Sequence, residues 1–478
     1  MFLPPQVIKN IVTETNKYAR EVIDSKKEWM DSHPKSRYYK WKPVDECTIR
    51  RYFAICFEMG LTVRKNAETY WSTRKSKHIG FFSDAMSRDL YCLVRRFLHV
   101  NDSQKEKKRG EDGFDPWHKV RPFLDSCNKL FKAHYTPQQT LSYDESLVAM
   151  KNRIVYLQYM PDKRHARFGI KKFELCEASS GYMYHVDLYS SKDFFATGAK
   201  EGLGHKVIMN AMKESGVLNK GYHLITDNFY TKIPLATALL DQKTYLSGTI
   251  RANSKFLPKN LMNAKLNVND PLYFRKGEIL ACGFKEKPKR KPVYLVSTFV
   301  HADNVTYENR KGLITKPKVI HDYNIGMGGV DLCDKKIYHY ASERRTNRYW
   351  VKIFMNMLDM CVLNAYIIYV QNTDKPIARF DFITSIIEHY VYGVPPQGAT
   401  PLRKCLTPPT SPAGSATGFL HEYQRIPGSL QRFCAVCPRR ARHWCPGCNC
   451  GIHEDCWPQL EHFWRAKGQP KKRGRVDL

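Results

Sequence analysis

The sequence contains no run of 18 apolar residues, about the length that a membrane-spanning helix requires. Its most apolar segment, residues 350–370, is interrupted by four polar side chains, namely Lys352, Asn356, Asp359 and Asn364. We therefore predict a helix buried in a protein core at this position, and no membrane partner. Residues 1–20 also lack the apolar core and the small-residue cleavage site of a signal peptide.

Acidic residues are scarce, because 46 Asp and Glu residues stand against 77 Lys and Arg residues and give a formal net charge of +31. Such an excess favours a polyanionic partner. Nucleic acid is the first candidate and a membrane surface the second, and of the two we expect nucleic acid. The 478 residues suffice for about three domains, and 42% of them are hydrophobic, so the chain can bury sizeable cores.

Cysteines are sparse over most of the chain, where nine are scattered between Cys47 and Cys405. Scattered single cysteines favour a reducing compartment and argue against a disulfide framework. The other six crowd into residues 434–456 at spacings that suit the tetrahedral N and S ligands of zinc. Eight candidate ligands would hold two zinc ions, with pairs that could interleave in a cross-brace: Cys434, Cys437, Cys445, Cys448, Cys450, His453, Cys456 and His462. Zinc could serve there only to hold together a fold too small for a core, or the module could also bind a partner.

The chain is organised around residues 323–334, which read YNIGMGGVDLCD. The glycines Gly326, Gly328 and Gly329 predict a tight turn, and a helix is expected to follow over residues 330–340. Asp331 and Asp334 are three positions apart, so they share one face of the first helical turn. This pair is either an ordinary acidic helix start or part of a site for a hard divalent cation.

Two further aspartates favour the cation site. Asp144 lies in the middle of a strand predicted over residues 140–150, and Asp227 follows a strand predicted over residues 223–226. A helix is expected over residues 233–240, and an acidic residue between a strand and a helix is a common position for a site. Asp144, Asp227 and Asp331 could converge only through folding, and such a triad suits two-metal phosphodiester chemistry.

The remaining pattern predicts a mixed α/β protein with helical flanks. Helices are expected over residues 41–60, 82–100, 205–215 and 343–392, and another is expected to open at residues 115–117. Strands are expected over residues 153–159, 169–178, 182–189, 245–251, 272–274, 279–284 and 293–300. Residues 253–317 read as an insertion, and a proline-rich flexible linker precedes the cysteine cluster.

The sequence resembles the piggyBac family of DNA transposases over nearly its whole length. The segments that carry the resemblance are DPWHKVRPFLD at 115–125, SYDES around Asp144, QYMPDKRHARFGIK at 158–171, ITDNFYTKIPLA around Asp227, GTIRANSKFLPK at 248–259, DYNIGMGGVDLCDK around Asp331, RRTNRYW at 344–350 and the terminal cysteine module. The resemblance implies an RNase H-like catalytic core, a flanking all-helical domain, a small β-rich insertion and a C-terminal cross-brace zinc finger.

The boundaries expected from pattern and resemblance together are as follows. A helical dimerisation and DNA-binding domain takes residues 1–139 and 343–393, and the RNase H-like catalytic domain takes residues 140–252 and 318–342. The insertion domain takes residues 253–317, the linker residues 394–430 and the zinc-binding domain residues 431–478.

The resemblance also implies an activity. Its metal-binding aspartates fall on Asp144, Asp227 and Asp331, assisted by Asp334, and the expected ion is Mg2+ or Mn2+. Such enzymes cut double-stranded DNA at transposon ends, pass through a hairpin and rejoin the ends at TTAA. A homodimer on DNA and a location in the nucleus are expected. The alternatives are a host-adopted, catalytically silent relative that binds DNA or chromatin, and a zinc-finger chromatin reader with an inert body.

Two basic clusters beside the expected active site are predicted to contact DNA phosphates, although a charge run is often only a solvated face. They comprise Lys163, Arg164 and Arg167, and Arg344, Arg345, Asn347 and Arg348. One zinc is expected on Cys434, Cys437, His453 and Cys456, and the other on Cys445, Cys448 and His462 with Cys450 as a further candidate. This module is predicted to recognise the transposon end.

Overall fold

The computed structural model describes residues 1–161, 167–190, 202–309, 312–342 and 345–394, followed by 424–425, 432–433, 437, 440–445, 450–453 and 456. The chain divides into two units, Met1–Cys405 and Leu406–Leu478. The first holds a mixed α/β fold, and the second holds short strand pairs around the cysteine cluster.

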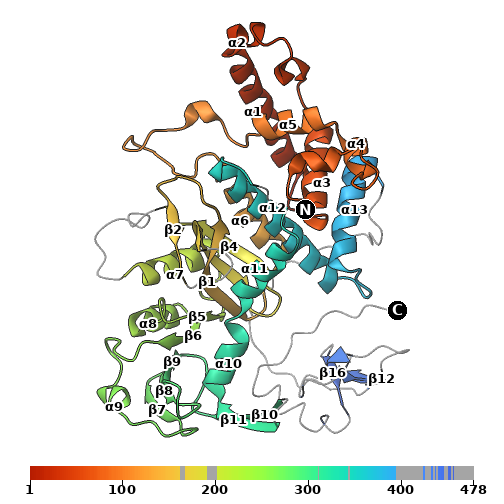
Figure 1. Cartoon of the computed structure of the whole chain (residues 1–478). Helices are drawn as coiled ribbons and strands as arrows, with labels where there is room; N and C mark the ends of the chain where they lie inside the picture. Colours follow the sequence, from red (N-terminus) through yellow and green to blue (C-terminus); the bar gives the residue numbers. More distant parts are fainter. Residues whose placement is uncertain are drawn as a thin grey trace, which may run out of the picture. The chain divides into compact units, whose positions relative to one another are not determined.

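The first unit is built on a sheet of nine strands in the order β2-β3-β1-β5-β6-β9-β8-β7, with β4 also paired to β3 (Figure 1). β1 and β6 run parallel to β5, and the other neighbours are antiparallel. The strands are β1 (Thr140–Ala149), β2 (Leu157–Tyr159), β3 (Phe168–Glu177), β4 (Met183–Leu188), β5 (His223–Thr226), β6 (Tyr245–Ile250), β7 (Leu272–Lys276), β8 (Ile279–Phe284) and β9 (Val293–Ser297). The strands expected at these positions are confirmed with end shifts of a few residues.

The two faces of this sheet differ in character. Residues that pair across neighbouring strands point to the same face, so the register of β1, β3 and β5 sorts their side chains into two sets. We call one set the α7 face, after helix α7 (Leu203–Glu214); it carries Tyr143, Phe173, Leu175 and Leu224. We call the other set the α11 face, after helix α11 (Gly329–His339); it carries Ser142, Asp144, Lys172, Glu174 and Ile225.

Different helices cover the two faces. α7 (Leu203–Glu214) lies over the α7 face, where the Tyr143 hydroxyl donates to the Val207 carbonyl at 3.3 Å, and α8 (Ile233–Asp241) packs near β6. α10 (Lys318–Gly326), α11 (Gly329–His339) and α12 (Tyr349–Gln371) lie over the α11 face.

Both flanks of the chain contribute to one helical region. Its members are α1 (Pro5–Asp24), α2 (Lys27–Asp31), α3 (Glu46–Leu61), α4 (Gly80–Ala85), α5 (Arg88–Phe97), α6 (Arg121–His134), α12 and α13 (Arg379–Tyr392), with single 3-10 turns at Arg37–Lys40, Ala67–Trp71 and Ser103–Lys105. Residues far apart in sequence meet here, since α3 packs against α13 (Figure 1). In addition, the ring centroid of Phe354 on α12 lies 4.7 Å from that of Phe123 on α6.

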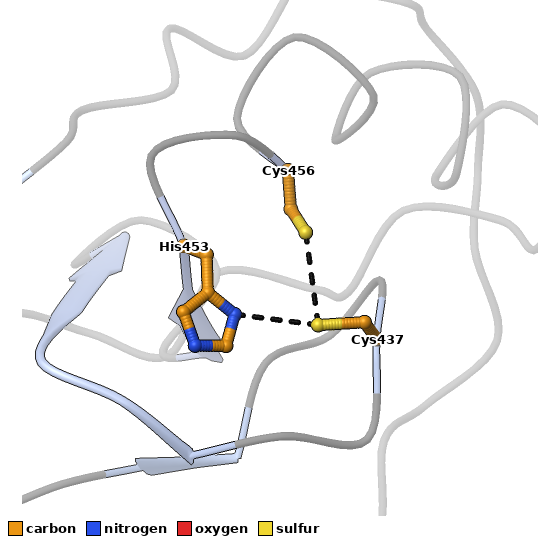
Figure 2. A group of neighbouring side chains, drawn as sticks. All are labelled: Cys437, His453 and Cys456. Carbon is orange, nitrogen blue, oxygen red and sulfur yellow. Dashed lines mark hydrogen bonds between the residues drawn. The ribbon is translucent and has the colours of Figure 1, made fainter. Parts of the chain in front are cut away.

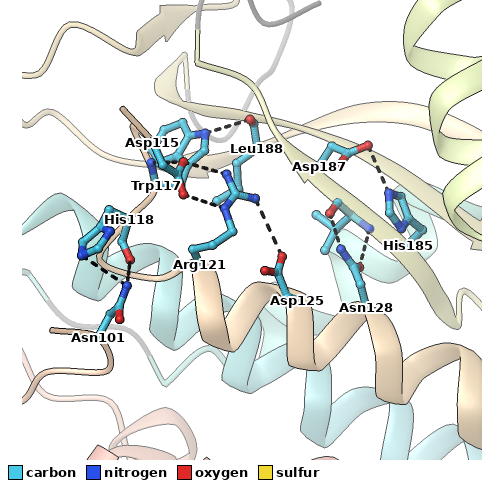
Figure 3. Close-up of polar contacts among 11 residues, drawn as sticks. Asn101, Asp115, Trp117, His118, Arg121, Asp125, Asn128, His185, Asp187 and Leu188 are labelled. Atoms are coloured by element: carbon cyan, nitrogen blue, oxygen red, sulfur yellow. Dashed lines mark hydrogen bonds and ion pairs between the residues drawn. The ribbon is translucent and has the colours of Figure 1, made fainter. Parts of the chain in front are cut away.

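The helical stretch expected over residues 343–392 is divided into α12 and α13. Local caps explain where two other expected helices differ from the structure. The helix expected over residues 82–100 is two helices, because the Ser87 hydroxyl accepts the Leu90 amide and starts α5 afresh. The helix expected to open at residues 115–117 begins only at Arg121. Asp115 instead accepts the Trp117 amide at 2.9 Å and pairs with the Arg121 guanidinium at 2.7 Å, which holds a turn ahead of α6 (Figure 3).

Two asparagines bind the outer edge of β4. Asn128 of α6 exchanges two hydrogen bonds of 3.0 Å with the backbone of Val186, and Asn364 of α12 exchanges two of 2.8 and 2.9 Å with Met183. The Trp117 indole donates to the Leu188 carbonyl further along the same edge (Figure 3). The helical region is therefore joined to the sheet by side-chain amides.

The apolar helix predicted over residues 350–370 is α12, and it is long and apolar enough to cross a membrane by length and composition alone. Most of it is buried against the rest of the protein, as expected. Its polar side chains each have a partner inside the fold: Lys352 donates to the Ala149 carbonyl, Asn356 accepts from Lys172, and Asp359 accepts the Ser342 amide.

The block at residues 253–317 continues the main sheet, because β9 pairs with β6 and leads on to β8 and β7. It also contains the short helix α9 (Lys259–Met262) and a hairpin that the sequence analysis did not assign, β10 (Asn304–Asn309) with β11 (Gly312–Pro317). The second unit contains β12 (Gln424–Arg425), β13 (Arg432–Phe433), β14 (Arg440–Ala441), β15 (His443–Cys445) and β16 (Cys450–Ile452). The expected domain boundaries remain predictions.

Candidate active site and metal centre

Asp144 and Asp227 lie at neighbouring positions of adjacent strands. β1 and β5 are parallel, and Tyr143 of β1 pairs with Thr226 of β5. Asp144 is the next residue after Tyr143, and Asp227 is the next residue after Thr226. Asp144 is half-buried within β1, and Asp227 is half-buried just past the end of β5. The two strands therefore place side by side two carboxylates that are far apart in sequence.

The glycine-rich segment brings α10 and α11 close against the α11 face. A Cβ atom on Gly326 would lie 2.1 Å from the Ile225 side chain, and one on Gly329 would lie 2.9 Å from Cβ of Ser142. The Ser142 hydroxyl donates to the Met327 carbonyl between the two helices at 2.9 Å. We predicted these glycines for a tight turn, but Gly326 and Gly329 serve close packing of helices on strands.

This packing sets Asp331 and Asp334 over the strand that carries Asp144. Asp331 lies exposed in the first turn of α11, and Asp334 is half-buried one turn later. The Nζ atom of Lys172 on β3 lies 4.0 Å from Oδ1 of Asp334. Two elements of the predicted constellation, the strand pair and the acidic helix start, are thus adjacent in the fold.

Negative charge accumulates around Asp227. Burial and the neighbouring charge of Glu145 raise the pKa of Asp227, although backbone amides and Lys171 act in the opposite direction. The Tyr323 hydroxyl of α10 is affected by both carboxylates, because burial and then the charges of Asp227 and Asp144 raise its pKa. A hard divalent cation would relieve this accumulation, and carboxylate oxygens are the ligands that it prefers.

The aspartates are not gathered into a tight cage. Among the residues that the structure describes, the group whose ligand atoms all lie within 4.8 Å of one another is Cys437, His453 and Cys456. The role of Asp144, Asp227, Asp331 and Asp334 as cation ligands therefore stays a prediction.

Sequence reasoning missed a charged and aromatic cluster beside Asp227. The Tyr230 hydroxyl donates to Oε2 of Glu145 at 2.5 Å, and Nζ of Lys171 lies 3.6 Å from the same carboxylate. Lys171 also lies over the Phe229 ring at 5.2 Å. Lys171 belongs to the segment 158–171, which carries the family resemblance. The partners of its side chain come from β1 and from the loop after β5, so they cannot be identified from the sequence of that segment.

The predicted DNA contacts are only partly visible. Lys163, Arg164 and Arg344 lie outside the described residues, whereas Arg167, Arg345 and Asn347 are exposed. The Arg348 guanidinium donates to the carbonyls of Arg95, Arg96 and Leu98 at the end of α5. Arg348 therefore caps that helix, and a DNA contact through the same group would have to replace these bonds.

Three of the predicted zinc ligands converge in the second unit. Sγ of Cys437 lies 3.3 Å from Nδ1 of His453 and 3.7 Å from Sγ of Cys456 (Figure 2). One imidazole and two thiols at such distances suit a tetrahedral zinc site. Cys434, the fourth ligand expected there, lies outside the described residues, as do Cys448 and His462 of the second expected site.

The backbone of the other predicted site is partly described. Cys445 and Cys450 are directly paired across β15 and β16. In the part of the first unit that the structure describes, no disulfide joins the cysteines Cys47, Cys56, Cys92, Cys127, Cys176, Cys282, Cys333 and Cys361.

Comparison with known proteins agrees with this arrangement. A family model described as Transposase IS4 matches residues 1–366. The human PiggyBac transposable element-derived protein 3 is 23% identical over 423 residues, covering 85% of this chain and 68% of the relative. The human PiggyBac transposable element-derived protein 2 is 22% identical over 382 residues, covering 77% of this chain and 60% of the relative.

A solved structure is also similar. It is the piggyBac transposase in a synaptic complex with hairpin DNA, determined by cryo-electron microscopy, with a TM-score of 0.71 and 25% identity. The match covers 82% of this chain and 79% of the other.

Proposed function

Since this chain belongs to the piggyBac family of transposases, we propose that it is a metal-dependent DNA transposase that excises and integrates a transposon at TTAA through a hairpin intermediate. The observation that carries the proposal is the placement of Asp144 and Asp227 on adjacent parallel strands, with the acidic start of α11 packed over the same sheet. We propose that this sheet is an RNase H-like catalytic core.

The four aspartates would have different roles in binding divalent cations. Asp144, Asp227 and Asp331 would supply the carboxylate oxygens, and Asp334 would assist from the next turn of α11. When bound, a pair of Mg2+ or Mn2+ ions would stabilise the attacking and leaving oxygens of a phosphodiester exchange. Lys171, held between Glu145 and the Phe229 ring, offers a positive charge to a DNA phosphate beside Asp227.

The remaining expectations belong to the same proposal. The protein would act as a homodimer on double-stranded DNA in the nucleus, with basic clusters around residues 163–167 and 344–348 on the phosphate backbone. Two zinc ions would fold the cysteine module, which would recognise the transposon end. Convergence of Cys437, His453 and Cys456 supports the first of these zinc sites.

A second candidate function is DNA binding without catalysis. The human relatives are titled as transposable element-derived proteins, and a host-adopted relative could keep the fold while losing the reaction. The retained aspartates favour an active enzyme.

Strand nicking of a DNA with transposon ends separates the two functions. Asp227→Ala should lower the nicking rate by at least about 100-fold, because it removes a charge that acts in the transition state, while DNA affinity stays within about threefold. Asp241→Ala, which changes an exposed aspartate at the end of α8, is the matched control and should cut normally. Equal nicking by both variants would refute the active site, and a wild-type protein that binds but never nicks would favour the silent relative.

The zinc module is tested in the full chain. Cys437→Ser should release zinc and reduce discrimination between end DNA and scrambled DNA, whereas Cys92→Ser, in α5, should change neither. Unchanged discrimination after loss of zinc would show that the module does not read the end.

A further inference from the structure

A buried ion pair lies beneath the candidate active site, on the strand next to Asp144. Lys172 and Glu174 of β3 have side chains that are 1% and 0% exposed, and Nζ of Lys172 lies 2.5 Å from Oε1 of Glu174. Burying a charge costs several kcal/mol unless a partner compensates it, and a buried pair adds little net stability compared with apolar residues of similar size. A role beyond stability would explain why this position carries charge.

The lysine of this pair joins three elements. Its Nζ atom donates to Oδ1 of Asn356 on α12 at 3.0 Å and lies 4.0 Å from Oδ1 of Asp334 on α11. The ammonium group of Lys172 therefore lies between a carboxylate of the sheet, an amide of α12 and a carboxylate of the candidate site.

The register of the sheet links the same pair to Asp144. Glu174 is the direct partner of Asp144 across β3 and β1, and Lys172 is the direct partner of Ser146. Side chains of directly opposed residues share one face and lie roughly 5 Å apart at Cβ. Asp144, Glu174 and Lys172 thus form one patch of the α11 face, and Asp334 approaches this patch from the helix above.

We propose that Lys172 is a positioning residue, which fixes the Asp334 carboxylate and thereby the start of α11 over Asp144. Glu174 holds the ammonium group from the sheet, and Asn356 holds it from α12. The proposal rests on the proposed function, since it assigns the pair to the cation site of that function. Lys172 itself would touch neither the DNA nor a cation.

The decisive variant removes both charges together. Lys172→Met combined with Glu174→Met leaves no lone buried charge, so the fold is expected to persist. Loss of an outer partner of a metal ligand typically weakens metal affinity about 10- to 100-fold. We therefore expect the Kd for Mn2+ at the aspartate site, measured by electron paramagnetic resonance on the zinc-loaded full chain, to rise by about this factor.

A kinetic readout separates positioning from damage. Nicking by the double variant should need about 10-fold or more Mn2+ for half of its maximal rate, while the rate at saturating Mn2+ recovers to near wild type. Asn356→Ala removes no charge and should shift the Mn2+ Kd in the same direction, about threefold or more, which provides a second variant if the first does not fold.

The matched control is the ion pair of Lys316 and Glu286, which has the same 2.5 Å separation outside the candidate site. Lys316→Met with Glu286→Met should leave Mn2+ affinity unchanged. A folded Lys172/Glu174 double variant, or a folded Asn356→Ala protein, with wild-type Mn2+ affinity would overturn the positioning role. If the Asp331→Ala variant binds Mn2+ with the Kd of the wild type, the aspartate site is refuted, and the proposed function with it.

Discussion

The two faces of the central sheet differ in how they bury adjacent residues of the same strand. On the α7 face, Phe173 packs between aromatic rings, with ring centroids 5.8 Å from Tyr189 and 6.3 Å from Tyr230. On the α11 face, the adjacent residues Lys172 and Glu174 are equally buried but charged. At Phe173 the α7 face needs volume, whereas at Lys172 and Glu174 the α11 face needs a balance of charge.

This difference predicts which amino-acid substitutions each face can tolerate. Volume on the α7 face can be supplied by another apolar side chain of similar size, because the hydrophobic effect is not directional. Charge on the α11 face can be removed only in compensating pairs, because a single buried charge has no substitute partner. Four experiments, from the largest expected effect to the smallest, test this contrast.

The largest effect is expected when one charge of the α11 face is removed alone. Lys172→Met leaves Glu174 buried without its ion pair and should lower the free energy of unfolding by about 3 to 5 kcal/mol. Adding Glu174→Met should restore most of this loss. Urea unfolding midpoints of the single and the double variant measure the loss and its recovery. A Lys172→Met protein as stable as the wild type would contradict the proposed difference between the two faces.

Acid should act on the same face through His223. This buried side chain bonds to the Ser247 hydroxyl at 2.8 Å, and burial lowers its pKa to about 4, against a weaker opposing effect of Asp322. Because the folded pKa lies below the unfolded value, the stabilisation is complete above about pH 6.5 and is lost as the pH falls towards 4. The loss should reach about 3 kcal/mol.

The test compares unfolding midpoints at pH 7.5, 6 and 5 for wild type and His223→Gln. The variant keeps a polar group for Ser247 but cannot take up the proton, so its stability should depend less steeply on pH. Parallel curves for the two proteins would contradict the assignment to His223.

A smaller effect is expected from the glycines beneath α11. Gly329→Ala would place a Cβ 3.0 Å from the Glu177 carbonyl oxygen and the Ala178 Cα, which are backbone atoms with little freedom to move. Such overpacking should cost about 1 to 3 kcal/mol and shift α11 relative to Asp144. Gly328→Ala is the control, since nothing lies within 4 Å of its Cβ position, and thermal unfolding of the two proteins should differ.

The smallest effect is expected on the α7 face. Phe173→Leu keeps an apolar side chain among rings and should cost less than about 1.5 kcal/mol, without changing the Mn2+ dependence of nicking. A change in metal dependence would show that the two faces are not independent.

Much of the fold could be predicted from the sequence, because alternation and turn residues mark strands directly. The strand that ends before Asp227 was predicted with its observed bounds, and Asp144 was placed correctly within β1. The helix that carries Asp331 and Asp334 was also predicted. Helix starts were less predictable, since the Ser87 cap and the Asp115 turn depend on local hydrogen bonds that compete with a continuous helix.

The ion pair beneath the site could not be predicted, for a physical reason. Lys172 and Glu174 alternate with Phe173 and Leu175, which is the pattern of a strand with one face in water. Alternation tells which residues share a face, but it does not tell what covers that face. Only the docking of α11 and α12, which come more than 150 residues later, places these charges in the interior.

The asparagines on β4 have a consequence for how this sheet behaves towards other chains. An open edge strand offers its amides and carbonyls to any extended peptide, which can add as a further strand and begin aggregation. Asn128 and Asn364 present to Val186 and Met183 the donor and acceptor that a foreign strand would present. Each side-chain amide therefore forms the hydrogen bonds that one peptide unit of a neighbouring strand would form. A foreign strand could pair with β4 only after α6 or α12 had been displaced.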